Sequence, residues 1–411
     1  MFAPYVNLLP AVHQGIPLFF GPAAVAAMQY PPASEQLKRR SRFLVNFARG
    51  PLAAASGASH GGPFDGRTVD ANALGWAYAC ASSRAFRIAG PEYPAAMLPL
   101  IDVANHSFDP TAMVRPAPGG AIEMAATKSL KTGDEVSLNY GNLTNDAFLL
   151  DYGFVPLESA GANGGNPYDA AGLRWDVGLL EAAREIAGLS AVPFGASAAG
   201  MGTALGGDAP FAPWQKQALM ALGLESGGAE AGAGAAVFNP EVLVTRHSRQ
   251  PVDMRLLAGL RVLYASSPGD LMDGAGKARR AEGSGRAGDK RGGVSAEMSE
   301  AAGIDVFAPL TLGSLWDSPL DRVREVYALR TCQAALALAL GNFPTTMKED
   351  EEVLRKLAAE SAAADGDTEA ASRADIATAV RFRMGKKSVI SGAMKIIDER
   401  LRAVIASGGG D

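Results

Sequence analysis

The sequence predicts an α+β protein built from two parts of different character. Up to about residue 157, short apolar runs separated by turns containing Gly and Asp predict a region of short strands and loops. Beyond it, apolar residues recur at helical spacing, which predicts a mostly α-helical second part. The chain has 411 residues, 48% of them hydrophobic, which is enough apolar material for two packed cores. Two domains are therefore expected, residues 1–157 and 158–411.

The first part is expected to hold one helix and several short strands. Small residues over 70–83 predict the helix, and short β-like runs predict strands over 98–103, 122–126 and 135–139. The first of these runs carries Asp102 and is followed directly by Asn105-His106-Ser107. Three hydrogen-bonding residues at the end of a buried strand raise the question of what they bind.

The second part is expected to contain long amphipathic helices. Two sets of apolar residues keep to one helical face: Leu320, Val323, Val326, Tyr327, Ala334 and Leu338, then Ile390, Met394, Ile397, Leu401 and Val404. Large apolar residues almost disappear between Pro268 and Gly293, so a disordered insertion is predicted over about 268–300. A shorter linker is predicted over 358–371.

Charge and composition narrow the classes of partner. A net charge of −5 and a pI near 5.6 argue against a nonspecific nucleic-acid binder, because phosphate neutralisation needs a basic face. Cys80 and Cys332 are too few and too far apart for a disulfide framework or a thiolate zinc site. The best apolar run, 332–340, is about half the roughly 20 residues that a membrane helix needs. Small molecules or proteins are the expected partners, with no nucleic acid and no membrane.

Two motifs leave alternatives open when each is taken alone. Asp102 and His106 lie four residues apart, so a metal site or an acid–base pair is conceivable, although His13, His60 and His247 are isolated from other ligand residues. The simpler interpretation is that His106 caps the end of a strand. The stretch GSGRAG at 283–288 matches a dinucleotide-binding fingerprint, but no strand is predicted before it, and the fingerprint has meaning only at a strand-to-helix turn.

A second cluster changes the interpretation of the first. From Glu135 the chain runs EVSLNYGNLTNDAFLLDYGFVP, in which Tyr140 and Tyr152 flank a short predicted helix. Together with the first cluster it resembles the SET-domain protein methyltransferases, in the group around Rubisco large-subunit methyltransferase. The resemblance is carried by SSRAF at 82–86, PLIDVANHS at 99–107, KTGDEVSLNYG at 131–141 and NDAFLLDYGF at 145–154. The segment 2–10 and the stretches 318–336, 343–354 and 373–390 resemble other parts of that family.

The resemblance implies a fold and an activity. The fold would be a SET-type strand and loop fold with an inserted helical segment, followed by a mostly α-helical substrate-binding domain. The activity would be transfer of a methyl group from S-adenosyl-L-methionine to a lysine of a nonhistone protein, with Rubisco large subunit or an aldolase as possible substrates. The family group implies a monomer without a metal and a chloroplast location, with a cytoplasmic or nuclear location as the alternative.

The resemblance also assigns roles to residues around the cofactor. Arg84 would pair with the methionine carboxylate, because the planar guanidinium suits a bidentate contact. Asn105 and His106 would hold the adenine end through groups fixed at the strand end. Tyr152 would pack beside the cofactor.

Further roles concern the substrate lysine. Asp102 would lie on the side of the substrate amine, with Arg84 close to it, and Tyr140 would orient the lysine nitrogen and the methyl group. Phe154 would help to exclude water.

One departure from the family concerns the start of the chain. Met1-Phe2-Ala3-Pro4 already resembles the family's later insert, so the glycine-containing first cofactor loop is expected to be missing from these 411 residues. Tight binding of the cofactor would contradict the expectation that an essential half of the pocket is absent. The alternative function is a noncatalytic protein-binding module built on a truncated SET scaffold.

Overall fold

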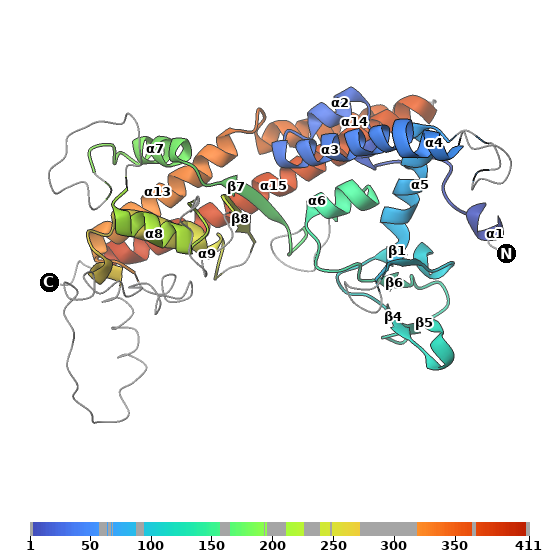
Figure 1. Ribbon diagram of the computed structural model, residues 1–411, viewed down its shortest axis with the longest axis horizontal. Coiled ribbons are helices and arrows are strands. Elements are labelled where there is room, and N and C mark those ends of the chain that lie inside the picture. Colours follow the sequence, from blue (N-terminus) through green and yellow to red (C-terminus); the bar gives the residue numbers. More distant parts are fainter. Residues whose placement is uncertain are drawn as a thin grey trace. The chain divides into compact units, whose positions relative to one another are not determined.

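The computed structural model describes residues 3–56, 64, 67, 69–87, 94–156, 165–192, 194, 211–225, 239–246, 249–271, 319–363 and 367–407. The chain divides into two compact units, Met1–Asp169 with Phe343–Lys386, and Ala170–Asn342 with Lys387–Asp411. Helices and two-stranded sheets together confirm the α+β class (Figure 1). The predicted insertion from residue 272 on and the GSGRAG stretch lie outside the described residues. Among described helices, none is both long and apolar enough to span a bilayer.

Most of the first unit is helical. Its helical segments are α1 (Ala3–Val6), η1 (Pro17–Phe19), α2 (Pro22–Ala27), α3 (Pro31–Phe47), η2 (Ala48–Leu52), α4 (Ala53–Ser56), α5 (Ala71–Arg84), η3 (Ile101–Val103), η4 (Pro118–Gly120), α6 (Asn145–Ala147), η5 (Phe148–Tyr152), α14 (Met347–Ala363) and α15 (Asp367–Ala406) as far as Lys386. Proline opens α2 and α3, where its fixed φ and missing N–H suit the first turn. The Asp70 carboxylate caps α5 by accepting a hydrogen bond from the Ala73 N–H at 2.8 Å, so the helix predicted over 70–83 is confirmed.

Three short strand pairs complete the first unit. The strands are β1 (Ala85–Phe86) with β2 (Ala96–Met97), β3 (Asn105–His106) with β6 (Ser137–Leu138), and β4 (Ala112–Pro116) with β5 (Ile122–Ala126). The strand predicted over 122–126 is confirmed, and the one predicted over 135–139 shortens to β6. The strand predicted over 98–103 is wrong. Leu100 has a φ of +74°, which breaks extended backbone, and the following residues form the 3₁₀ turn η3 around the buried Asp102.

The second unit packs helices around one buried helix. Its elements are β7 (Ala170–Arg174) with β8 (Glu241–Thr245), α7 (Val177–Ile186), α8 (Pro213–Ala221), α9 (Met254–Tyr264), α13 (Arg322–Gly341) and α15 from Lys387. Every residue of α9 from Leu256 to Tyr264 is buried, as expected for a helix that is covered on all sides. The helical spacing expected beyond residue 157 does not begin at once, because Leu173 lies in β7. In the first unit, the described part of the linker predicted over 358–371 is helical, because α14 continues to Ala363 and α15 begins at Asp367.

An ion pair lies inside the second unit. Arg261 of α9 donates to Glu325 of α13 through Nε at 2.9 Å and Nη2 at 2.6 Å, and both side chains are buried. The Leu320 N–H donates to the same carboxylate at 3.2 Å. Two charges in this environment are stable only while both partners remain, since an unpaired buried charge is strongly unfavourable.

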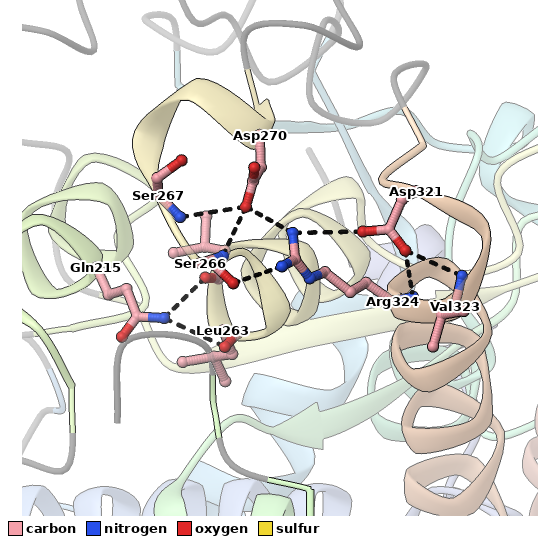
Figure 2. A network of polar contacts seen from close by, with 9 residues as sticks. Gln215, Leu263, Ser266, Ser267, Asp270, Asp321, Val323 and Arg324 are labelled. Atoms are coloured by element: carbon pink, nitrogen blue, oxygen red, sulfur yellow. Dashed lines mark hydrogen bonds and ion pairs between the residues drawn. The ribbon is translucent and has the colours of Figure 1, made fainter. Parts of the chain in front are cut away.

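A second polar network links the described ends of 249–271 and 319–363 (Figure 2). Asp270 accepts hydrogen bonds from the Ser266 N–H at 2.7 Å, the Ser267 N–H at 3.2 Å and Arg324 Nη1 at 2.7 Å. Arg324 also donates to Ser266 Oγ at 2.5 Å and contacts Asp321, the N-cap of α13. These contacts hold the two chain segments together at the start of α13.

The buried ion pair gives a stability prediction. Replacement of Glu325 by alanine should lower the free energy of unfolding by about 3–5 kcal/mol, because the buried Arg261 loses the carboxylate that it pairs with. Urea unfolding followed by tryptophan fluorescence measures the change. Arg402→Ala, which removes the mostly exposed pair with Asp398, is the control and should change stability little. Equal effects of the two variants would contradict the interpretation.

Candidate functional site

The two predicted motif clusters meet in the first unit. β3 and β6 run parallel, with Asn105 opposite Ser137 and His106 opposite Leu138. The Ser107 N–H extends the pairing by donating to the Leu138 carbonyl at 2.8 Å. Leu138 is buried with Ala104 and Ala112, so apolar packing supports the short ladder. The pairing brings the end of the Asn-His-Ser motif beside the segment that leads into Tyr140.

Tyr140 is held by both its backbone and its side chain. Its N–H donates to His106 Nδ1 at 3.1 Å, and its hydroxyl donates to the Ala104 carbonyl at 2.6 Å. The ring stacks on Tyr152 with centroids 4.9 Å apart. Burial, with a smaller contribution from Tyr152, raises the pKa of Tyr140 to about 12. The phenol is therefore protonated at neutral pH, its proton is engaged by Ala104, and its oxygen lone pairs remain able to accept.

Arg84, Asp102 and Tyr5 form a second polar group. Arg84, at the last turn of α5, places Nη1 3.2 Å from both the Asp102 backbone carbonyl and its carboxylate Oδ2. The Tyr5 hydroxyl donates to the same Oδ2 at 2.5 Å. Burial and then the hydrogen bond to Asp102 raise the pKa of Tyr5 to about 12. Tyr5 was not predicted, because an isolated tyrosine near the start of the chain carries no motif.

Two buried atoms of this group have no partner among the described residues, Arg84 Nε and Asp102 Oδ1. Buried polar atoms in proteins are nearly always hydrogen-bonded, so an unsatisfied donor and an unsatisfied acceptor in one ion pair mark a place for a ligand. The donor is part of a cation and the acceptor is part of an anion. A ligand that carries both an acidic and a basic group fits this pair.

Two cavities meet at four of the predicted residues. The larger, of about 820 Å³, and the smaller, of about 330 Å³, are both lined by Arg84, Asp102, Tyr140 and Tyr152. Cavities that hold small molecules usually measure roughly 300–1,000 Å³. A ligand in either cavity would therefore contact the same four side chains.

The remaining wall residues differ between the cavities. The larger cavity continues along β1 and β4, past Phe86 and Val114. The smaller one continues past His13, Asn105 and Phe154. Asn105 donates from Nδ2 to Glu135 at 2.9 Å, which fixes its amide at the wall of the smaller cavity.

His106 takes a different place from the other predicted residues, because it lines neither cavity. Its ring lies among aromatic rings, with centroids 4.5 Å from Phe108, 4.7 Å from Phe148 and 5.2 Å from Tyr140. Burial lowers its pKa, so the neutral form is favoured. Because Nδ1 accepts from Tyr140, the neutral ring carries its proton on Nε2, which has no partner among the described residues. His106 therefore does not line either cavity and instead holds the Tyr140 backbone through a hydrogen bond.

The structure does not support the metal site or the acid–base pair that the spacing of Asp102 and His106 allowed. Asp102 contacts Arg84 and Tyr5, whereas His106 contacts Tyr140. Within the described part of the chain, no three His, Cys, Asp or Glu residues lie close enough to hold a metal ion. The structure thus places the two residues in separate groups.

Two glycines allow the segment that carries Tyr152 to approach the chain near Ile16. The helical segment 145–152 ends at Gly153, which has a φ of +81°. A Cβ on Gly153 would lie 2.8 Å from Ile16 Cγ1 and 2.9 Å from the Gly15 carbonyl carbon. Gly15, with a φ of +80°, makes the reciprocal approach to the Gly153 carbonyl. Glycine at these positions was not predicted, although the YGF triplet at 152–154 contains the signal.

Comparisons with known proteins identify the fold. A sequence model of the Rubisco LSMT substrate-binding family matches residues 206–390. The crystal structure of the SET domain of LSMT bound to lysine and AdoHcy aligns with 98% of this chain and 72% of its own, at a TM-score of 0.54 and 16% identity. The chain has an LSMT-like SET fold. The resemblance drawn from the four motifs is confirmed at that level.

Two other solved structures, both of Rubisco LSMT, also match this chain. Rubisco LSMT bound to AdoMet matches at a TM-score of 0.53 and 16% identity, covering 98% of this chain and 72% of that one. Rubisco LSMT bound to sinefungin and monomethyllysine matches at a TM-score of 0.52 and 16% identity, covering 98% and 71%. No curated protein sequence matches the LSMT-like chain.

The close approach at Gly153 gives a second prediction. Gly153→Ala should lower the free energy of unfolding by about 2–4 kcal/mol, because left-handed strain is joined by contact with the backbone near Ile16. Gly119→Ala is the matched control, since its φ is +77° and no described atom lies within 4 Å of the added carbon. The control should lose only about 1–2 kcal/mol from the conformational strain. Chemical denaturation measures both, and equal losses would show that the contact at Gly153 has no effect.

Proposed function

We propose that the LSMT-like chain is an S-adenosyl-L-methionine-dependent protein-lysine N-methyltransferase that acts on a nonhistone protein. The observation that carries the proposal is the meeting of two cavities at Arg84, Asp102, Tyr140 and Tyr152. A methyl transferase needs such a place, because a donor and an acceptor must reach one point from opposite sides. The neighbouring LSMT structures support the assignment, because they are bound to AdoHcy, AdoMet or sinefungin, two of them together with lysine or monomethyllysine.

The residues present fit the proposed cofactor. When bound, S-adenosylmethionine supplies a methyl group on a sulfonium centre. Arg84 Nε, a buried donor without a described partner, matches the carboxylate group of a methionine moiety. Asn105 would bind the adenine end from the wall of the smaller cavity, and His106 would contribute backbone groups of β3. Tyr152 would pack against the cofactor with its ring.

The amine side of the reaction sets the second requirement. A lysine amine must be neutral to attack, and a free lysine at pH 7 is disfavoured in that form by about 4.6 kcal/mol. Partial desolvation beside aromatic rings and a neighbouring cationic donor lower the amine pKa. Tyr140 is suited to orient the amine, because its own proton is held by Ala104 and its oxygen can accept an N–H. Positioning in a dry channel, assisted by Asp102 and Phe154, then replaces a strong base.

The substrate is the finer part of the proposal. The match of 206–390 to a Rubisco LSMT substrate-binding family supports a protein as the substrate. We propose Rubisco large subunit or an aldolase as the substrate, a chloroplast as the location and a monomer as the working form.

Binding of the cofactor can be tested on the expressed chain. Titration calorimetry with S-adenosylhomocysteine should detect weak binding, and Arg84→Lys should weaken it further, about tenfold, because lysine keeps the charge but loses the guanidinium fork. Arg115→Lys is the control, since Arg115 pairs with Glu123 on the β4–β5 hairpin and should leave affinity unchanged. Absence of binding to the unmodified chain would instead favour the noncatalytic protein-binding module.

The role of Tyr140 can be tested by turnover. Tyr140→Phe should lower methyl transfer at least about 100-fold while cofactor affinity stays within about twofold, because only orientation of the amine is lost. Purified Rubisco and aldolase with radiolabelled S-adenosylmethionine serve as probes, and mass spectrometry locates the methylated lysine. Tyr168→Phe, at a tyrosine that is 43% exposed and lines neither cavity, is the control. Full activity of Tyr140→Phe would exclude the assigned role.

A further inference from the structure

Lys386 is a buried cation that the proposed reaction does not use. It lies on α15, is 0% exposed, and belongs to the first unit. Its ammonium donates to Asp146 and, at 2.7 Å, to Asp169 Oδ1. The rings of Tyr30 and Phe382 lie 5.4 and 5.2 Å from the nitrogen, within the range of a cation–π contact. Burial lowers the pKa of Lys386, but the two carboxylates outweigh it and raise the pKa overall, so the side chain is charged.

The same contacts hold the first turn of α6. Asp169 accepts from the Asn145 N–H at 3.0 Å and from Asn145 Nδ2 at 2.9 Å. Asn145 Oδ1 in turn accepts from Asn166 Nδ2 at 3.0 Å. A Cβ on Gly385 would lie 2.8 Å from Asn145 Nδ2, so the backbone of α15 lies directly against α6. Two adjacent residues of α15, Gly385 and Lys386, therefore define where α6 begins.

From that turn the chain continues without a break to the proposed active site. α6 runs into η5, which ends at Tyr152, and Tyr152 stacks on Tyr140. The far end of the segment is held by Arg40, which donates to the Leu150 carbonyl at 3.1 Å and to Asp151. The segment 145–152 is thus fixed at both ends, and the buried cation provides the fixed point at its beginning.

We propose that Lys386 is a positioning residue, which acts through Asp146 and the segment 145–152 to hold Tyr152 against Tyr140. The proposal rests on the function proposed above. A buried ion pair contributes little to stability relative to apolar packing, but it permits few geometries, because each partner must keep its charged contact. The contacts of Lys386 with two carboxylates, together with those of the Asn145 amide, fix one position of α6. An apolar contact would not fix a single position.

Asp146→Ala is the informative variant. It removes the link to α6 and leaves Lys386 in contact with Asp169, so the buried ammonium keeps a carboxylate partner. Hydrogen exchange of the amides of 145–153 should become about tenfold faster or more, because the first turn of the segment opens more often. Methyl transfer should fall at least about tenfold and the KM for S-adenosylmethionine should rise, because a misplaced Tyr152 moves Tyr140 and loses its packing against the cofactor.

Asp350→Ala is the matched control. Asp350 is a buried carboxylate of the same unit that pairs at 2.8 Å with Arg383, three residues before Lys386 on α15. Its removal should destabilise the unit without selective change in the exchange of 145–153 or in the KM-to-kcat pattern. If either alanine variant does not fold, Asp146→Asn and Asp350→Asn, which keep the side-chain shape, replace the pair.

The outcomes separate this proposal from the proposed function. Faster exchange confined to 145–153 in the Asp146 variant alone supports positioning by Lys386, and unchanged exchange there, or equal change in both variants, overturns it. The exchange measurement requires no activity, so it decides the positioning claim even if the unmodified chain transfers no methyl group. A chain without turnover would count against the proposed function alone.

Discussion

The parallel pairing of β3 with β6 is the constraint on which the candidate site depends. Only two residues of each strand take part, Asn105 and His106 with Ser137 and Leu138. Yet the pairing places the Ala104 carbonyl where it accepts the Tyr140 hydroxyl, and His106 where it accepts the Tyr140 N–H. Such a short ladder contributes few hydrogen bonds, so the buried side chains around Leu138 and Phe148 must supply most of its stability.

Around that pairing, charge is used in two ways. Arg84 and Asp102 are incompletely satisfied, which leaves a donor and an acceptor for a ligand. Lys386 and Arg383 reach buried carboxylates from α15 and fix neighbouring helices. The first arrangement leaves polar atoms available to bind a ligand, and the second uses ion pairs to fix the positions of neighbouring elements. The second unit repeats the latter arrangement with Arg261 and Glu325 inside its helical core.

Much of the site was predictable because the relevant residues occur in contiguous motifs. Arg84, Asp102, Asn105, Tyr140 and Tyr152 were selected from sequence; Asn105 lines the smaller cavity and the other four line both. The contribution of Tyr5 was not predictable, since its contact with Asp102 spans 97 positions and has no local pattern. The strand over 98–103 was mispredicted, because a short apolar run does not show the positive φ at Leu100.

The sequence by itself determined the α+β class, the helix after Asp70, the strand over 122–126 and the candidate residues, because periodicity, caps and turns act over a few neighbouring positions. The tertiary structure alone decided which of those residues share a wall, that His106 stands behind Tyr140, and that Lys386 is enclosed by Asp146 and Asp169. These depend on contacts between segments up to 240 positions apart, where burial and charge compensation act together. No local sequence pattern predicts these contacts, because they form only when the folded core brings the distant segments together.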